Sequence, residues 1–213
     1  VRGVTFNIAK GKTLGVVGES GSGKSVTSMS LLRLNDITGA FMPKGKIHLN
    51  SARLGRVDIT AADEKMMGAI RGREIGMIFQ EPMTCLNPVL SIHMQLTEHL
   101  FQHFNLSEEE AEEKVIGLLR RVRIPDPEGK LNQYPHNLSG GMRQRVMIAM
   151  ALACGPSLLI ADEPTTALDV TIQAQILDLI KDVQDEFGMS VLFITHDMAV
   201  IAEMADEVIV MFD

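Results

Sequence analysis

Residues 13–25 read Thr-Leu-Gly-Val-Val-Gly-Glu-Ser-Gly-Ser-Gly-Lys-Ser, and this stretch decides the fold. The apolar run at 14–17 predicts a buried strand, and the pattern from Val26 to Leu34 predicts a helix that opens just after the loop. The loop glycines let backbone N–H groups point inward at the positive end of that helix, which makes a cradle for phosphate oxygens. We expect Lys24 to reach the β- and γ-phosphates of a nucleotide and Ser25 to offer its hydroxyl to a bridging Mg²⁺. The alternative, a Gly-Ser turn before an ordinary helix, does not explain the preceding strand.

Apolar runs without alternation recur along the chain, as is typical of parallel strands covered on both faces. The predicted strands are 13–17, 75–79, 158–161, 191–195 and 207–211. Ser107 and Glu110 predict a capping box at the start of a helix, and a second helix is predicted from about Thr171 to Phe187, ending at Gly188. Residues 40–60 predict a small antiparallel hairpin region, whereas residues 81–156 contain helical patterns and no convincing strand. We therefore predict a single α/β domain over 1–213, with a core at 1–80 and 157–213 and a helical subdomain at 81–156.

Composition excludes several classes of protein. The chain has 213 residues and a formal net charge of −7, which argues against a general nucleic-acid binder. The longest apolar run, 146–154, is far shorter than the ~20 residues needed to cross a bilayer. Two cysteines without metal-type spacing make a reducing, cytosolic location the default. The chain starts at Val1 and ends just after an apolar run, so we expect both ends to be cut from a longer polypeptide.

Two acids follow the predicted strand Leu158-Leu-Ile-Ala, at the edge where parallel sheets bind ligands. We expect Asp162 to belong to the Mg²⁺ shell, through water, and Glu163 to act as the general base or to orient the water that attacks the γ-phosphate. A polar turn before Pro164 is the alternative, and the phosphate loop disfavours it.

A second anion cradle is predicted at Ser139-Gly140-Gly141, which opens an almost uniformly apolar helix. Ser139 can cap that helix while the glycine N–H groups stay open to a phosphate. This cradle has no lysine and no preceding strand, so it cannot serve a nucleotide alone. We interpret it as a half-site that another subunit, or a folding-back of this chain, completes.

Over its whole length the chain resembles the ATP-binding cassette ATPases that drive ABC transporters. The resemblance assigns the nucleotide-binding loop to Gly18, Glu19, Ser20, Gly21, Ser22, Gly23, Lys24 and Ser25 with Val26 after them, the Q-loop to Gln80, the signature to Ser139, Gly140 and Gly141, the Walker B strand to 158–163, the D-loop to 167–169 with Asp169, and the switch histidine to His196. The stretches Gln80-Glu-Pro-Met-Thr-Cys-Leu-Asn-Pro and Tyr134-Pro-His-Asn-Leu-Ser-Gly-Gly-Met-Arg-Gln-Arg-Val are similar to the branch that imports peptides, glutathione or nickel complexes in bacteria.

The resemblance implies a clamp in which ATP and Mg²⁺ lie between the Lys24 loop of one cassette and the Ser139 signature of another. It implies that Gln80 senses the metal and the attacking water, and that His196 hydrogen-bonds the γ-phosphate. The expected partners are a second cassette, identical, homologous or fused in tandem, and permease subunits that dock on 81–135. An extracytoplasmic solute-binding protein is an indirect partner, and nucleic acid is not expected.

The resemblance implies a protein that acts at the cytoplasmic face of the bacterial inner membrane and is held there by the permease. Two alternatives stay open: a soluble cassette acting on DNA or ribosomes, and a regulatory ATP-binding module without turnover. The adenine-stacking aromatic of the family would lie before Val1, and a C-terminal extension would follow Asp213.

Two further clusters invite a functional interpretation. His99 and His103 stand one helical turn apart, which is metal-ligand spacing, but no third ligand has the required position, so we predict a solvated helix face. The basic run Arg120, Arg121 and Arg123 is interpreted as the end of a helix, solvated or facing a partner.

Overall fold

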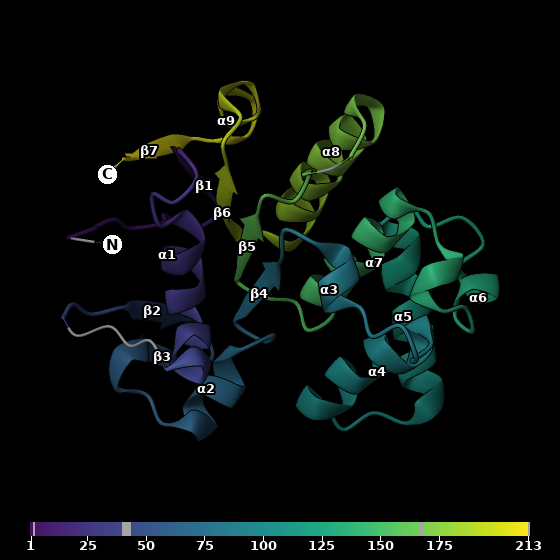
Figure 1. Ribbon diagram of the computed structural model, residues 1–213. Helices are drawn as coiled ribbons and strands as arrows, with labels where there is room; N and C mark the ends of the chain where they lie inside the picture. Colours follow the sequence, from purple (N-terminus) through teal and green to yellow (C-terminus); the bar gives the residue numbers. More distant parts are fainter. Residues whose placement is uncertain (2, 40–43, 167, 213) are drawn as a thin grey trace.

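The computed structural model describes residues 1, 3–39, 44–166 and 168–212. Five parallel strands form the central sheet in the order β4-β5-β6-β1-β7 (Figure 1). Their bounds are β1 Thr13–Gly18, β4 Ile75–Ile78, β5 Leu158–Asp162, β6 Ser190–Thr195 and β7 Glu207–Met211. The predicted strands are therefore confirmed to within one residue at each end, and so is the α/β fold class.

Alternate side chains of the sheet enter two separate cores, because successive residues of a strand point to opposite faces. In β6, Val191 and Phe193 join the core formed with α7 (Gly140–Leu152), α8 (Val170–Phe187) and α9 (Met198–Met204). Leu192 and Ile194 join the core formed with α1 (Lys24–Leu31), α2 (Glu64–Ile70) and the pair β2–β3. Burial on both faces explains why the central strands carry apolar residues without alternation.

The small antiparallel region is confirmed as the pair β2 (His48–Ser51) and β3 (Gly55–Asp58). Its register runs from His48 opposite Asp58 to Ser51 opposite Gly55. Residues 40–43 of the predicted region, Pro43 among them, lie outside the described residues. Short 3₁₀ helices at Leu34–Thr38 and Ile59–Ala61 flank the pair.

The chain leaves the sheet after β4 and returns at β5, and the described part of residues 81–156 contains helices and no strand. These are α3 (Pro82–Cys85), α4 (Ile92–His103), α5 (Glu108–Arg121), α6 (Pro127–Lys130), the 3₁₀ helix Pro135–Asn137 and α7. They gather on one side of the molecule, away from α1, α2 and β2–β3 (Figure 1). The predicted capping box is present, since Ser107 accepts from the N–H of Glu110 while the Glu110 side chain accepts from the N–H of Ser107.

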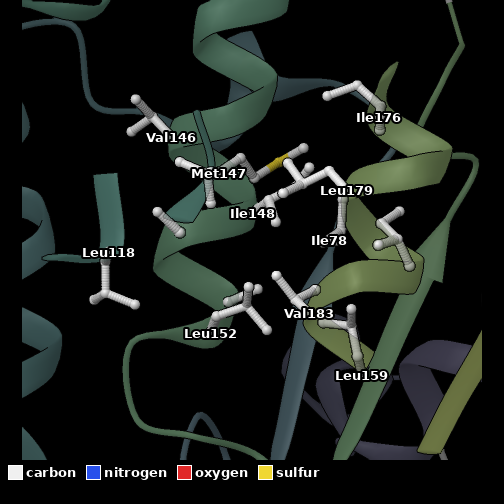
Figure 2. Close-up of a cluster of buried hydrophobic side chains, with 14 of the residues drawn as sticks. Ile78, Leu118, Val146, Met147, Ile148, Leu152, Leu159, Ile176, Leu179 and Val183 are labelled. Atoms are coloured by element: carbon white, nitrogen blue, oxygen red, sulfur yellow. The ribbon is translucent and has the colours of Figure 1, made fainter. Parts of the chain in front are cut away.

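Helix α7 joins this helical group to the sheet. Its side chains Met147, Ile148 and Leu152 lie beside Leu179 and Val183 of α8 and Ile78 of β4 (Figure 2). Helix α7 is buried almost all round, as its sequence predicts, because it has the sheet and α8 on one side and α4 and α5 on the other.

Four local expectations are wrong. Helix α1 stops at Leu31 instead of Leu34, because Arg33 takes a left-handed backbone conformation (φ 53°). The helical period places Phe187 on the apolar face of α8 with Ile176 and Val183, which are buried, but Phe187 is exposed at the end of the helix. Strand β7 is an edge strand with Val208 and Val210 exposed.

The fourth concerns His99 and His103, which are half-buried instead of solvated, and burial lowers the pKa of both. None of the helices among the described residues combines the length and apolarity needed to cross a membrane.

Candidate functional site

The loop between β1 and α1 is shaped as a cradle for anionic oxygens. Gly18 must lack a side chain, because a Cβ there would lie 2.2 Å from the backbone oxygen of Met211. Gly21 and Gly23 have φ angles of +89° and +94°, a conformation that glycine adopts without strain. Gly23 is the N-cap of α1 and offers no side-chain cap, so the first N–H groups of the helix remain available to a bound anion.

Lys24 points back into this loop. Its side chain is buried, and Nζ donates to the backbone oxygens of Gly18 at 2.8 Å and Glu19 at 2.9 Å. Ser22 Oγ is buried in the same loop and has no hydrogen-bond partner among the described residues, which is costly unless a ligand supplies one. Glu19 and Ser20 are exposed at the loop's outer edge, and Val26 is half-exposed on the first turn of α1. The amide cradle, the lysine and the orphaned hydroxyl together fit a polyphosphate.

Asp162 stands at the carboxyl end of β5 and receives two hydroxyl groups from α1. Ser25 Oγ donates to Asp162 Oδ1 at 3.2 Å, and Ser28 Oγ donates to Oδ2 at 3.3 Å. Burial raises the pKa of Asp162, while these two hydroxyls and the charge of Lys24 oppose the rise. A hydroxyl oxygen beside a carboxylate is the kind of donor set that Mg²⁺ prefers, so the residues present fit this ion.

Gln80, Glu163 and His196 come from the ends of β4, β5 and β6 and meet in one hydrogen-bonded group. Gln80 Nε2 donates to Glu163 Oε2 at 3.1 Å, and His196 Nδ1 lies 3.2 Å from Glu163 Oε1. An ionised carboxylate can only accept, so this contact is a hydrogen bond in the tautomer of His196 that has its N–H at Nδ1. Glu163 is mostly buried and His196 mostly exposed, so the group opens to solvent on the histidine side.

Two hydroxyl residues of this site escaped the sequence analysis. Thr166 Oγ1 donates to Glu163 Oε2 at 2.9 Å, and Ser28 binds Asp162 as described above. The spacing from a predicted site residue could have identified each of them. Ser28 lies one helical turn after Ser25, and Thr166 lies three residues after Glu163 in the turn that follows the strand.

The second predicted cradle lies at the start of α7. Ser139 caps the helix by accepting from the N–H of Met142 at 3.3 Å, and Gly140 is exposed. Gly141 packs against α8, since a Cβ there would be 3.0 Å from Ile172 Cγ2. Asp169 caps α8 by accepting from the N–H of Ile172 at 2.9 Å. Ala167 of the predicted D-loop lies outside the described residues.

Within the ranges that the structure describes, no hydrogen bond or ion pair joins Ser139, Gly140 or Gly141 to the loop of Lys24. The structure therefore brings Lys24, Ser25, Gln80, Asp162, Glu163 and His196 to one sheet edge, while the signature turn stands apart from it. That the signature completes a pocket on another cassette stays a prediction.

A cavity of about 500 Å³ lies among α4, α5 and α6 and is a poor site for a phosphate. Its lining includes five glutamates, Glu108, Glu109, Glu112, Glu113 and Glu128. That charge repels a polyphosphate.

Comparison with known proteins places this geometry in a family context. Residues 1–166 match the family described as ABC transporter. Over 212 residues, 100% of this chain, the sequence is 54% identical to the oligopeptide transport ATP-binding protein OppD of Bacillus subtilis (strain 168) and covers 58% of it. It is 53% identical over the same length to the glutathione import ATP-binding protein GsiA of Escherichia coli (strain K12) and covers 34% of that protein. The chain thus spans only part of the curated relatives it matches.

Solved structures agree with these relatives. A dimeric ATP-binding cassette in a post-hydrolysis state, bound to ADP and Pi, superposes with a TM-score of 0.81 at 29% identity, over 97% of this chain and 83% of that one. The cassette cbiO1 from Clostridium perfringens, part of the ABC transporter complex cbiONQ, superposes with a TM-score of 0.77 at 28% identity, over 98% of this chain and 76% of that one.

Proposed function

Because the chain belongs to the ABC transporter family, we propose that it is the ATP-binding and ATP-hydrolysing domain of a bacterial importer for peptides or related small solutes. The observation that carries the proposal is the meeting of Gln80, Glu163 and His196 beside the Lys24 loop, at one edge of a parallel sheet. The import proteins among the relatives, matched over the whole chain, support this function over a soluble cassette acting on DNA or ribosomes.

In this proposal the loop residues 18–26 bind the triphosphate through their N–H groups. Lys24 Nζ exchanges its hydrogen bonds to the loop carbonyls for bonds to the β- and γ-phosphates. Ser25 and the side-chain oxygen of Gln80, with Asp162 acting through water, would hold Mg²⁺, which would withdraw charge from the phosphate oxygens. Glu163 orients the attacking water and accepts its proton, and His196 hydrogen-bonds the γ-phosphate. Catalysis then rests chiefly on positioning and on charge compensation.

The proposal also includes a second cassette. Ser139, Gly140, Gly141 and Asp169 of one cassette face the ATP bound to the loop of the other, so that each nucleotide is held from two sides. The exposed signature turn, with no bond to the Lys24 loop among the described residues, supports this arrangement. Residues 1–80 and 157–213 form the nucleotide-binding core in this scheme, and residues 81–156 form the subdomain that carries the signature.

The expected membrane partners are permease subunits that dock on residues 81–135, with an extracytoplasmic solute-binding protein acting through them. The domain therefore works at the cytoplasmic face of the bacterial inner membrane, held there by the permease. No nucleic acid is expected as a partner, since the net charge of −7 opposes binding to phosphate backbones.

The test compares Lys24→Ala and Glu163→Gln in the full-length protein. Lys24→Ala is expected to lose ATP binding, whereas Glu163→Gln keeps it, lowers hydrolysis by about 10²–10⁴-fold and accumulates an ATP-bound dimer in light scattering. Matched controls are Lys181→Ala and Glu186→Gln, which alter exposed side chains of the surface ion pairs with Glu203 and Arg121. Unchanged hydrolysis in Glu163→Gln would overturn the role of Glu163. Purification of the full-length protein from its native membrane without any permease subunit would oppose the importer assignment.

A further inference from the structure

Three side chains donate hydrogen bonds to Glu163, and two of them bind other groups in the proposed reaction. Gln80 and His196 donate to its two oxygens, from residues that follow β4 and β6. In the proposed reaction Gln80 would bind the metal and His196 the γ-phosphate, so neither would remain a permanent support of the carboxylate. The third donor, the Thr166 hydroxyl, has no other partner among the described residues.

We infer that Thr166 is the positioning residue of Glu163, fixing the carboxylate that orients the attacking water. The inference rests on the proposed ATPase function. Its direct support is the bond of 2.9 Å from Thr166 Oγ1 to Glu163 Oε2, the shortest of the three contacts to this carboxylate.

The contact lies within one turn, to which the helical subdomain also binds, since Gln144 of α7 donates to the Pro164 oxygen. Thr166 lies three residues after Glu163 in the same turn, which is closed by a backbone bond from the Thr166 N–H to the Glu163 oxygen at 3.2 Å. The sheet fixes the other end of the turn, since the Glu163 N–H donates to the Ile194 oxygen of β6 at 2.9 Å. Thr166 and Glu163 therefore belong to one hydrogen-bonded turn anchored on β6.

The backbone at this point is also specialised. Glu163 has φ 48°, in the left-handed region that a non-glycine residue adopts only when its surroundings hold it there. The two neighbouring acids have different partners: Asp162 accepts from Ser25 and Ser28 of α1, whereas Glu163 accepts from the Thr166 hydroxyl. A fixed backbone alone leaves the side-chain torsions of a glutamate free, and the hydroxyl removes that freedom.

Thr166→Val tests the role, because valine keeps the shape of threonine and lacks the donor. We expect the kcat of ATP hydrolysis to fall about tenfold while the KM for ATP stays within twofold, since the bond acts on the water-orienting group and not on ATP binding. Thr166→Ser keeps the hydroxyl and is expected to restore most of the kcat. Thr97→Val, which removes a buried hydroxyl bound to the His93 carbonyl in α4, is the control and should leave hydrolysis near wild type.

A double-mutant comparison separates positioning from general damage to the fold. In a Glu163→Gln background, where the carboxylate is absent, Thr166→Val is expected to change the residual rate by less than twofold. An equal loss in both backgrounds, or wild-type kcat in Thr166→Val, overturns the inference while the ATPase function stands. Wild-type hydrolysis in Glu163→Gln alone would instead contradict the proposed function, so the two failures are distinguishable.

Discussion

Gly76 lies in β4 where α7 crosses the strand, and its replacement by alanine tests how closely the helical group is packed on the sheet. A Cβ on Gly76 would lie 2.3 Å from the backbone oxygen of Ala151 and 3.1 Å from Pro156 Cγ. Ala151 lies near the end of α7, and Gly76 is held in register with Leu159 of β5. Neither neighbour is a flexible side chain that could swing aside.

The size of the effect follows from this geometry. An ordinary contact begins at 3.4 Å, so strand and helix must separate by roughly 1 Å. Overpacking of a well-packed core costs about 1–3 kcal/mol, and backbone on both sides places this site at the upper end. The lower conformational entropy of the unfolded alanine variant offsets about 0.4–1 kcal/mol of this cost, so we expect a net loss of about 2–2.6 kcal/mol in the free energy of unfolding.

The assay is urea unfolding followed by far-UV circular dichroism, with Gly68→Ala as the matched control. Gly68 lies within α2, and a Cβ there meets nothing within 4 Å. This second alanine should raise the free energy of unfolding by about 0.5–1 kcal/mol, because glycine is a poor helix former. If Gly76→Ala and Gly68→Ala shift the urea concentration of half-unfolding in the same direction, the reasoning from the close packing of α7 on β4 is refuted.

Two other features give predictions of stability. Burial lowers the pKa of His99 and His103 below the ordinary value of 6.5. The unfolded chain therefore takes up these protons first as the pH falls, so stability present above pH 6.5 is lost below it. Replacing both with glutamine should flatten this decline in urea titrations from about pH 7 to 5, and an unchanged slope would exclude burial as its source. Arg145→Met should lower the free energy of unfolding by about 2–3 kcal/mol, because Arg145 is buried and donates to Val122 and Gln175. The control Arg121→Met alters a surface ion pair and should lower it by under about 1 kcal/mol in the same urea assay.

The features that the sequence predicts correctly are those encoded within one turn or one strand. The strands and the capping box at Ser107 depend on neighbours a few residues away, so they are readable from the chain. The position of β7 is different, because the order β4-β5-β6-β1-β7 makes β7 an edge only through β1, which is far away in sequence. Apolar composition alone therefore failed to separate exposed Val208 from buried strand residues.

The candidate site divides in the same way. The Lys24 loop has a local signature, whereas the support of Glu163 by Thr166 depends on a left-handed backbone at Glu163 that no residue type announces. The half-burial of His99 likewise arises from packing between segments far apart in the chain, as its carbonyl contact with Cys154 illustrates. A helical period identifies the face of α4 but not what covers it.

The strand order also explains how a large helical group can be inserted without disturbing the sheet edge. Strands β4 and β5 are paired directly, Ile75 opposite Leu158, although residues 79–157 lie between them in the chain. The edge that carries Gln80 and Glu163 is thus set by sheet hydrogen bonds. The Ser139 turn is positioned instead by the packing of α7 on β4 and α8, through contacts such as Gly76 with Ala151 and Gly141 with Ile172. The two cradles are nevertheless linked, because Gln144 of α7 donates to the backbone oxygen of Pro164 in the turn after Glu163, so a shift of α7 acts on that turn as well as on the signature turn.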